Sequence, residues 1–208
     1  MQIVELFRAS VHACSQNSFG LPSGRPAALA ACILGRSGCG KSTVLKVLAL
    51  ITRPDGGNLY VDGKDVAKLT VSEMDELRRE KVAYTFQEPP LMPYLTALEN
   101  VTAITGAPKD RAAELLSSLG LKDRLSHKPA KLSGGEKKRV DVARAILKGS
   151  PIMVADEPLS NLDPDTGSKV MELLRAHLEK GRVLVYSAVE PSETSFADDT
   201  LNMVKTRG

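Results

Sequence analysis

A glycine-rich stretch at residues 35–42 has the residue types and spacing to bind phosphate. It reads Gly-Arg-Ser-Gly-Cys-Gly-Lys-Ser and fits the pattern G-x-x-x-x-G-K-[ST] at every fixed position. Glycines let the backbone wrap closely around an anion, and the helix that follows adds the partial positive charge of its N-terminus. Lys41 is expected to reach the β- and γ-phosphates, and the Ser42 hydroxyl is expected to ligate Mg²⁺. We therefore predict binding of a nucleoside triphosphate at Gly35, Arg36, Ser37, Gly38, Cys39, Gly40, Lys41, Ser42 and Thr43.

Two adjacent carboxylates follow a second apolar stretch. Residues 152–155 read as a buried strand, and Asp156 and Glu157 come directly after it. In an open α/β sheet, ligands bind beyond the carboxyl ends of the strands. Asp156 is therefore expected to hold Mg²⁺, and Glu157 to polarise an attacking water as general base. An isolated Asp-Glu pair is often a simple cap, but the strand before it and the upstream phosphate loop favour the catalytic interpretation.

A second element with affinity for phosphate lies at residues 132–136, Leu-Ser-Gly-Gly-Glu. Ser133, Gly134 and Gly135 open a helix N-terminus, which is a favourable place for an anion. Two such elements in one chain suggest a split site, in which the second element serves the nucleotide of a partner. The alternative is an ordinary helix cap, which Ser133 alone would provide.

The elements that must position these residues alternate between strands and helices. We expect a buried parallel strand at 27–34, a helix at 41–51, strands at 58–61 and 82–86, and a short helix capped by Ser72 that runs to about residue 80. Later elements are a helix at 136–147, strands at 151–155 and 182–186, and between these two strands a helix capped by Asp163 that runs to residue 181. Short strands are also expected at 2–8 and 17–21.

Residues 88–135 differ in character from the flanking sequence. Three prolines interrupt its start, and helices are expected at 96–101 and 109–119. We interpret this segment as a small helical subdomain inserted into a single domain, 1–208, whose α/β core comprises residues 1–87 and 136–208. The expected fold is α/β: a P-loop NTPase core with a mostly parallel sheet, an N-terminal antiparallel β part and the inserted helical subdomain.

The composition argues against several classes of protein, among them nucleic-acid-binding, disulfide-rich and membrane-spanning proteins. The chain has 208 residues, a net charge of +3 with both signs well mixed, and three cysteines at irregular spacing. This predicts no nucleic-acid partner, no disulfide framework and no cysteine metal site. The N-terminus does not read as a signal peptide, and no apolar run approaches the ~18 residues of a membrane span. We expect a cytoplasmic protein, and any membrane-spanning part would come from another chain.

The combined motifs resemble the ATP-binding subunit of ABC transporters over nearly the whole chain. In the family's order, the chain has the phosphate loop at 35–42, Gln87, the signature at 132–136, Asp156-Glu157, and the segment 160–163. The resemblance implies two copies packed head to tail around two ATP molecules, each held by one chain's phosphate loop and the other chain's Ser133. Gln87 would contact Mg²⁺ and the attacking water, and would sense the docking of a membrane-spanning permease. The permease could meet Leu91 and Met92, which we expect to be exposed. The alternative is that these two side chains pack within the helical insertion.

Two features depart from the family's pattern. The usual switch histidine after the last core strand is replaced by Val189, or by Ala188 in a register shifted by one residue. Ser187, and less so Tyr186, are the nearby hydroxyls that would substitute for it. The aromatic residue that usually stacks on adenine has no convincing counterpart among Phe7, His12 and Phe19.

The sequence is compatible with three functions. The first is ATP binding and hydrolysis, with Mg²⁺, in a peripheral subunit on the inner face of the plasma membrane that powers separate permease subunits. The second is a degenerate subunit that holds ATP structurally and hydrolyses it slowly; the missing histidine favours it, and Glu157 opposes it. The third is a soluble ABC-type ATPase without a transport role.

Overall fold

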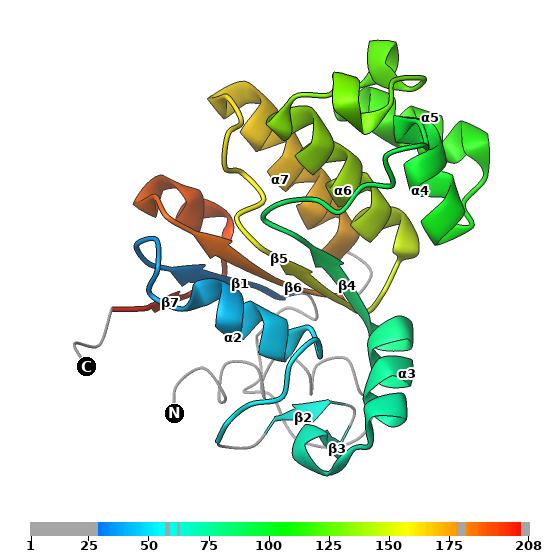
Figure 1. Ribbon diagram of the computed structural model, residues 1–208. Helices are drawn as coiled ribbons and strands as arrows, with labels where there is room; N and C mark the ends of the chain where they lie inside the picture. The colour runs from blue at the N-terminus through cyan, green and yellow to red at the C-terminus, as the bar shows by residue number, and fades with distance from the viewer. Residues whose placement is uncertain (1–28, 57–58, 62, 179–181, 205–208) are drawn as a thin grey trace.

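The computed structural model describes residues 29–56, 59–61, 63–178 and 182–204. Its centre is a five-stranded parallel sheet with the order β4-β5-β6-β1-β7, and a separate antiparallel pair joins β2 to β3 (Figure 1). The predicted α/β class with a mostly parallel sheet is therefore confirmed. The strands are β1 Leu29–Leu34, β2 Tyr60–Val61, β3 Lys64–Asp65, β4 Val82–Thr85, β5 Ile152–Ala155, β6 Val183–Ala188 and β7 Asp199–Asn202.

Helices cover both faces of the sheet. Figure 1 shows α6 and α7 on one face, with α4 and α5 beyond α6, and α2 on the other face. The α-helices are α2 Lys41–Leu48, α3 Val71–Lys81, α4 Ala97–Thr105, α5 Lys109–Ser118, α6 Gly134–Lys148 and α7 Pro164–Leu178. Short 3₁₀ helices lie at η1 Val66–Lys68, η2 Lys122–Arg124, η3 Pro129–Lys131 and η4 Pro191–Phe196.

The continuous apolar run of β1 is explained by its burial on both faces. Ala30 and Cys32 belong to the core cluster that includes α6 and α7, whereas Ala31 and Ile33 belong to the cluster that includes α2. Successive strand residues point to opposite faces, so a central parallel strand needs apolar residues at every position. The phosphate loop that follows β1 is therefore anchored in a core on both sides.

Three helices begin with the same reciprocal capping arrangement. Thr70 caps α3 with Glu73, Thr96 caps α4 with Glu99, and Ser133 caps α6 with Glu136. In each case the hydroxyl accepts from the N–H three residues on, and the glutamate accepts from the cap's own N–H. The expected cap at Ser72 is wrong, because Thr70 has a glutamate three residues later and Ser72 does not.

Several element boundaries differ from expectation. α6 begins at Gly134, two residues before the expected start, because the capping box places its first turn over the two glycines. β6 extends to Ala188, and β7 was not expected at all. The expected strands at 2–8 and 17–21, the adenine candidates Phe7, His12 and Phe19, and the expected helix end at 179–181 lie outside the described residues.

Candidate nucleotide-binding and catalytic site

The phosphate loop connects β1 to α2 and depends on glycine at three positions. Gly38 and Gly40 have φ angles of 77° and 99°, which side-chain-bearing residues rarely adopt. At Gly35, a Cβ atom would lie 2.7 Å from the Cys39 Sγ and 2.7 Å from the Met203 carbonyl oxygen. The N-cap of α2 is Gly40, and no side chain caps this helix. Among the described residues, no side chain accepts from the backbone N–H groups of this first turn, which are therefore suited to an anion.

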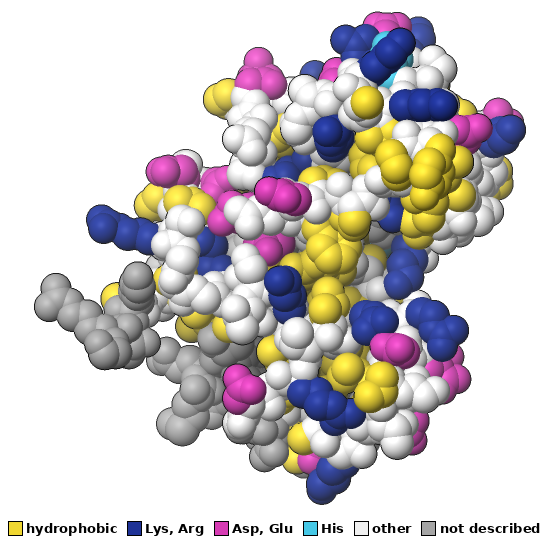
Figure 2. All heavy atoms as spheres, viewed as in Figure 1, with side chains coloured by type: hydrophobic (Ala, Val, Ile, Leu, Met, Phe, Trp, Pro, Cys, Tyr) yellow, Lys and Arg dark blue, Asp and Glu magenta, His cyan; other side chains and the backbone are white. Residues whose placement is uncertain are grey.

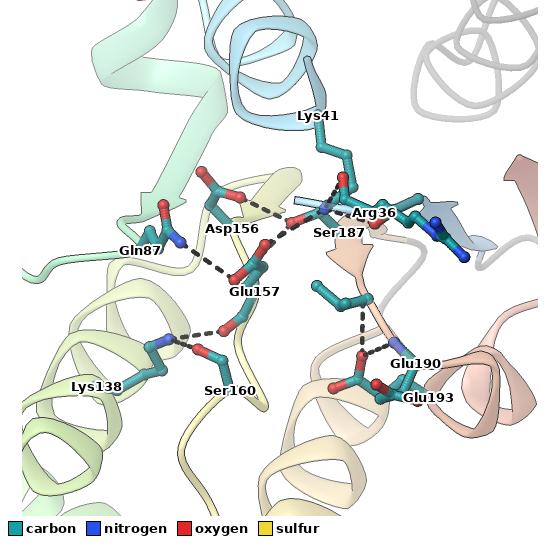
Figure 3. A network of polar contacts seen from close by, with 12 residues as sticks. Arg36, Lys41, Gln87, Lys138, Asp156, Glu157, Ser160, Ser187, Glu190 and Glu193 are labelled. Atoms are coloured by element: carbon teal, nitrogen blue, oxygen red, sulfur yellow. Dashed lines mark hydrogen bonds and ion pairs between the residues drawn. The ribbon is translucent and has the colours of Figure 1, made fainter. Parts of the chain in front are cut away.

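Lys41 extends from the first position of α2 back over the loop. Its Nζ donates to the carbonyl oxygens of Gly35 at 2.7 Å and Arg36 at 3.3 Å, and lies 3.4 Å from Glu157 Oε1 (Figure 3). The side chain is 4% exposed. An ammonium group held among acceptors at the loop suits binding of a polyphosphate. Of the next two residues of α2, Ser42 is half-buried and Thr43 is exposed.

Asp156 lies at the carboxyl end of β5 and is almost fully buried. Its Oδ1 accepts a hydrogen bond of 2.8 Å from the Ser187 hydroxyl, and its backbone N–H donates to the Thr85 carbonyl. Its second oxygen, Oδ2, has a long 3.5 Å contact to the Tyr84 hydroxyl. Burial and the charge of Asp156 raise the pKa of Tyr84, so the phenol stays protonated. The weakly engaged Oδ2 leaves Asp156 an oxygen for a cation ligand or its water.

Glu157 is held in an unusual backbone conformation by several groups. Its φ is 46°, in the left-handed region that costs a non-glycine residue about 1 kcal/mol or more. Its N–H donates to Ser187 Oγ at 2.8 Å, and its carbonyl oxygen accepts from Lys138 Nζ at 2.8 Å. Its carboxylate meets Lys41 on Oε1 and Gln87 Nε2, at 3.2 Å, on Oε2. These contacts fix the direction of the carboxylate (Figure 3).

Gln87 follows β4 on a backbone that α6 helps to position. The N–H of Phe86 donates to Asp141 Oδ2 at 2.9 Å, and Asp141 also pairs with Arg144 at 3.2 Å. Burial raises the pKa of Asp141 to about 6, although the Phe86 N–H and the charges of Arg144 and Lys138 oppose this. Farther along, the buried Asn100 side chain bonds the backbone of Met92, Leu95 and Thr96. The chain on both sides of Gln87 is thereby fixed to helices.

The expected exposure of Leu91 and Met92 is true of one residue only. Leu91 is half-buried and packs against the core cluster of α4 and α6, whereas Met92 is 39% exposed. Tyr94 is more exposed than either, at 74%.

Ser133, Gly134 and Gly135 lie apart from this network, at the start of α6. The backbone N–H of Ser133 lowers the pKa of Glu136, which also pairs with Arg124 at 2.8 Å. Ser133 and Gly134 are exposed. Among the described residues, no hydrogen bond or ion pair joins Ser133 to Lys41, Asp156 or Glu157. The structure thus unites Lys41, Gln87, Asp156 and Glu157, and leaves Ser133 facing outward.

The two hydroxyls considered as substitutes for the switch histidine are engaged elsewhere. Ser187 donates its proton to Asp156 and is 1% exposed. Tyr186 donates to the Glu193 carbonyl at 2.7 Å and is fully buried. In this structure Ser187 thus gives its single proton to Asp156 and not to a group in the gap. Ala188 is buried with its carbonyl accepting from the Gly35 N–H, and Val189 is 39% exposed.

Sequence reasoning missed two residues of the site, Lys138 and Asp141. Both are charged, and both are at most 3% exposed in α6. Their spacing of three residues places them on one side of the helix, close to the buried Val142 and Ala145. For Asp141 the signal available in the sequence was a carboxylate between the apolar residues Val140 and Val142, since a buried charge needs partners. Lys138 follows another lysine and precedes an arginine, so the sequence did not distinguish it.

The ABC transporter family model matches residues 15–160 of the chain. The chain belongs to this family. An uncharacterised ABC transporter ATP-binding protein of Thermotoga maritima is 42% identical over 160 residues, which are 74% of this chain and 68% of that protein. The macrolide export ATP-binding/permease protein MacB of Vibrio parahaemolyticus is 40% identical over 173 residues, 80% of this chain and 26% of MacB. The ABC chain thus spans about a quarter of the MacB relatives that it matches.

Solved structures of ABC cassettes have the same fold. This chain matches the cassette MJ0796 in a dimeric structure of a post-hydrolysis state bound to ADP and Pi. The match has a TM-score of 0.77 and 33% sequence identity, and it covers 88% of each chain. A second dimeric structure of MJ0796, described as a bacterial ABC transporter cassette, gives a TM-score of 0.76 at 34% identity and the same coverage. These matches confirm the predicted fold of an ABC ATP-binding subunit. None of the helices among the described residues could span a membrane.

Proposed function

We propose that this ABC chain binds ATP with Mg²⁺ and hydrolyses it as the energy-coupling subunit of a transporter. The observation that carries the proposal is the convergence of Lys41 and Gln87 on the carboxylate of Glu157, at 3.4 Å and 3.2 Å. A phosphate-loop lysine, a polar amide and a carboxylate at one point are the groups that in-line attack of water on a phosphoryl group requires.

Each residue has a separate role in this proposal. The loop N–H groups and Lys41 would bind the phosphates, and Ser42, Gln87 and Asp156 would hold Mg²⁺, which would supply charge neutralisation. Glu157 accepts the proton of the attacking water, and Gln87 orients that water together with Glu157. Ser187 orients both carboxylate residues, because it donates to Asp156 and accepts from the Glu157 N–H.

The outward-facing start of α6 supports a dimer as the active form. Ser133 and Gly134 are exposed at a helix N-terminus, where the capping box engages the N–H groups of Ser133 and Glu136. In a head-to-tail dimer, each copy would place these residues on the nucleotide of the other, and Asp163 would bridge the chains. The homologous MJ0796 cassette is described as dimeric.

A groove beside β4 supports docking on membrane-spanning permease subunits. It has a volume of about 390 Å³, and its lining includes Arg78, Arg79 and Arg144 together with the apolar side chains of Tyr84, Phe86 and Ile104. Figure 2 shows hydrophobic side chains on this face with Lys and Arg side chains beside them. The occupant we propose is a short permease segment with apolar and acidic side chains, which would place the chain at the cytoplasmic face of the membrane. A segment docked beside Phe86 would displace the backbone of Gln87, the next residue, which immediately precedes the proposed subdomain 88–135.

One observation favours slow hydrolysis by the isolated chain, the second of the three functions. Ser187 and Tyr186 donate their protons to Asp156 and Glu193, so neither hydroxyl has a proton for the γ-phosphate. The ATP affinity would be ordinary, because the phosphate loop and Lys41 do not depend on that donor.

The release of inorganic phosphate from MgATP by the purified chain tests hydrolysis. We expect measurable turnover by wild type and none by Glu157→Gln, which keeps the shape and removes the base. Co-expression with the permease subunits tests the transport assignment. We expect co-purification, and its loss in an Arg78→Glu, Arg79→Glu double variant. A chain that hydrolyses ATP but binds no permease would instead support a soluble ATPase.

A further inference from the structure

Lys138 is a buried lysine of α6 whose ammonium group connects this helix to the catalytic segment. Its Nζ donates to the Glu157 carbonyl oxygen at 2.8 Å and also to the Ser160 hydroxyl (Figure 3). The side chain is 3% exposed. Burial lowers the pKa of Lys138, while the charges of Glu157 and Asp156 favour the protonated form. A buried ammonium group is retained at a cost in desolvation, so its two acceptors define where it must lie.

A second contact joins the same two segments nearer the start of α6. A Cβ atom on Gly135 would lie 3.0 Å from the Asn161 carbonyl oxygen and 3.1 Å from Leu162 Cδ2. The helix therefore touches residues 157–162 at Gly135 and again at Lys138, one turn later. Because packed interiors transmit displacements, the first two turns of α6 and residues 157–162 are expected to move together.

We infer that Lys138 is a positioning residue that links Ser133, at the nucleotide of one half of the dimer, to Glu157, at the nucleotide of the other half. This inference rests on the proposed function, which assigns Ser133 to the partner's nucleotide. When Ser133 binds that nucleotide, the start of α6 becomes fixed, and the contact of Lys138 with the Glu157 carbonyl then keeps that backbone in the left-handed conformation already present. Capture of one ATP thereby prepares the carboxylate that acts on the other.

Turnover of Lys138 variants tests the positioning role. Lys138→Met keeps the length of the side chain and removes its donors. We expect kcat to fall on the order of 10- to 100-fold, because a small displacement of a catalytic group is enough for such a loss. The affinity for ATP should change little, since the phosphate loop is untouched. Lys138→Gln retains an N–H donor and should recover part of the rate. Lys169→Met makes the same change at an exposed lysine of α7 and should leave kcat unchanged.

A double-mutant cycle tests the link itself. If Ser133 acts on Glu157 through Lys138, the double variant Ser133→Ala, Lys138→Met should be little slower than the slower single variant. The inference would be overturned if the double variant lost kcat by the product of the two single losses. It would also be overturned if Lys138→Gln and Lys138→Met were both folded and both had the kcat of wild type. Neither result would contradict the proposed ATPase. Circular dichroism reports whether each variant is folded. A wild-type chain that neither hydrolyses ATP nor dimerises with it would instead overturn the proposed function, and the inference with it.

Discussion

The Nζ of Lys41 and the Oε1 of Glu157 lie 3.4 Å apart, although 116 positions separate the residues in the chain. One residue opens α2, and the other follows β5. Gln87 contacts the other oxygen of the same carboxylate, so the Glu157 carboxylate lies between the ammonium group of Lys41 and the side-chain amide of Gln87. A charge on the phosphate loop and a carboxylate that acts on water are thereby brought together.

Replacement of Lys41 should separate nucleotide binding from folding. Lys41→Ala removes a charge-assisted contact to the phosphates, which is worth about 1.5–3 kcal/mol, or roughly 10- to 100-fold in ATP affinity. Calorimetric titration with MgATP measures the effect. Lys46→Ala, at an exposed lysine of the same helix, is the control and should bind as wild type does. Unchanged affinity in Lys41→Ala would remove this loop from the nucleotide site.

Asp141 should make stability depend on pH. Its folded pKa is raised from 3.8 to about 6, so the folded protein holds this proton more tightly than the unfolded chain. The resulting stabilisation is fully present below pH 3.8 and is lost as the pH rises through about 6. Asp141→Asn should flatten the fall in the free energy of unfolding over that range, measured by urea titration at several pH values. Asp75→Asn, at an exposed carboxylate that also pairs with an arginine three residues on, should leave the slope unchanged. An identical slope in Asp141→Asn and wild type would contradict the assignment.

A histidine introduced at the carboxyl end of β6 should accelerate hydrolysis. A single donor to the transition state is worth on the order of 3 kcal/mol, or about 100-fold in rate. Either Val189→His or Ala188→His should therefore raise kcat with little change in ATP affinity. Val189 has the space, because it is 39% exposed, whereas Ala188 is buried. Brisk wild-type turnover that neither substitution alters would show that the donor is dispensable or comes from a partner.

Ser187→Ala is the companion measurement for the same strand end. It leaves Asp156 and the Glu157 N–H without their shared hydroxyl, so kcat should fall although Ser187 gives no proton to phosphate. Steady-state turnover at saturating MgATP measures this fall. A Ser187→Ala chain as fast as wild type would show that the other contacts of Glu157 suffice.

Local patterns in the sequence predicted the parts of the fold that depend on local chemistry. The loop at 35–42, the run at 152–155 and the helix after Ser133 each follow from neighbouring residues. The roles of Lys138 and Asp141 did not, because their acceptors and donors lie in distant segments, at Glu157 and Phe86. The bond from Ser187 to Asp156 was not predicted, for the same reason. A hydroxyl near a site can serve several acceptors, and only the register of β5 against β6 places it at Asp156.

The oligomeric state of Glu157→Gln in the presence of ATP reports on both the catalytic base and the sharing of nucleotides between two chains. If Glu157 is the base and two chains share two nucleotides, this variant should bind ATP, fail to hydrolyse it and remain a dimer. Gel filtration with light scattering should show monomer without nucleotide, dimer with MgATP and monomer with MgADP. Hydrolysis by Glu157→Gln at the wild-type rate would contradict the role of Glu157 as base, and a variant that binds ATP to saturation but stays monomeric would contradict the shared nucleotides.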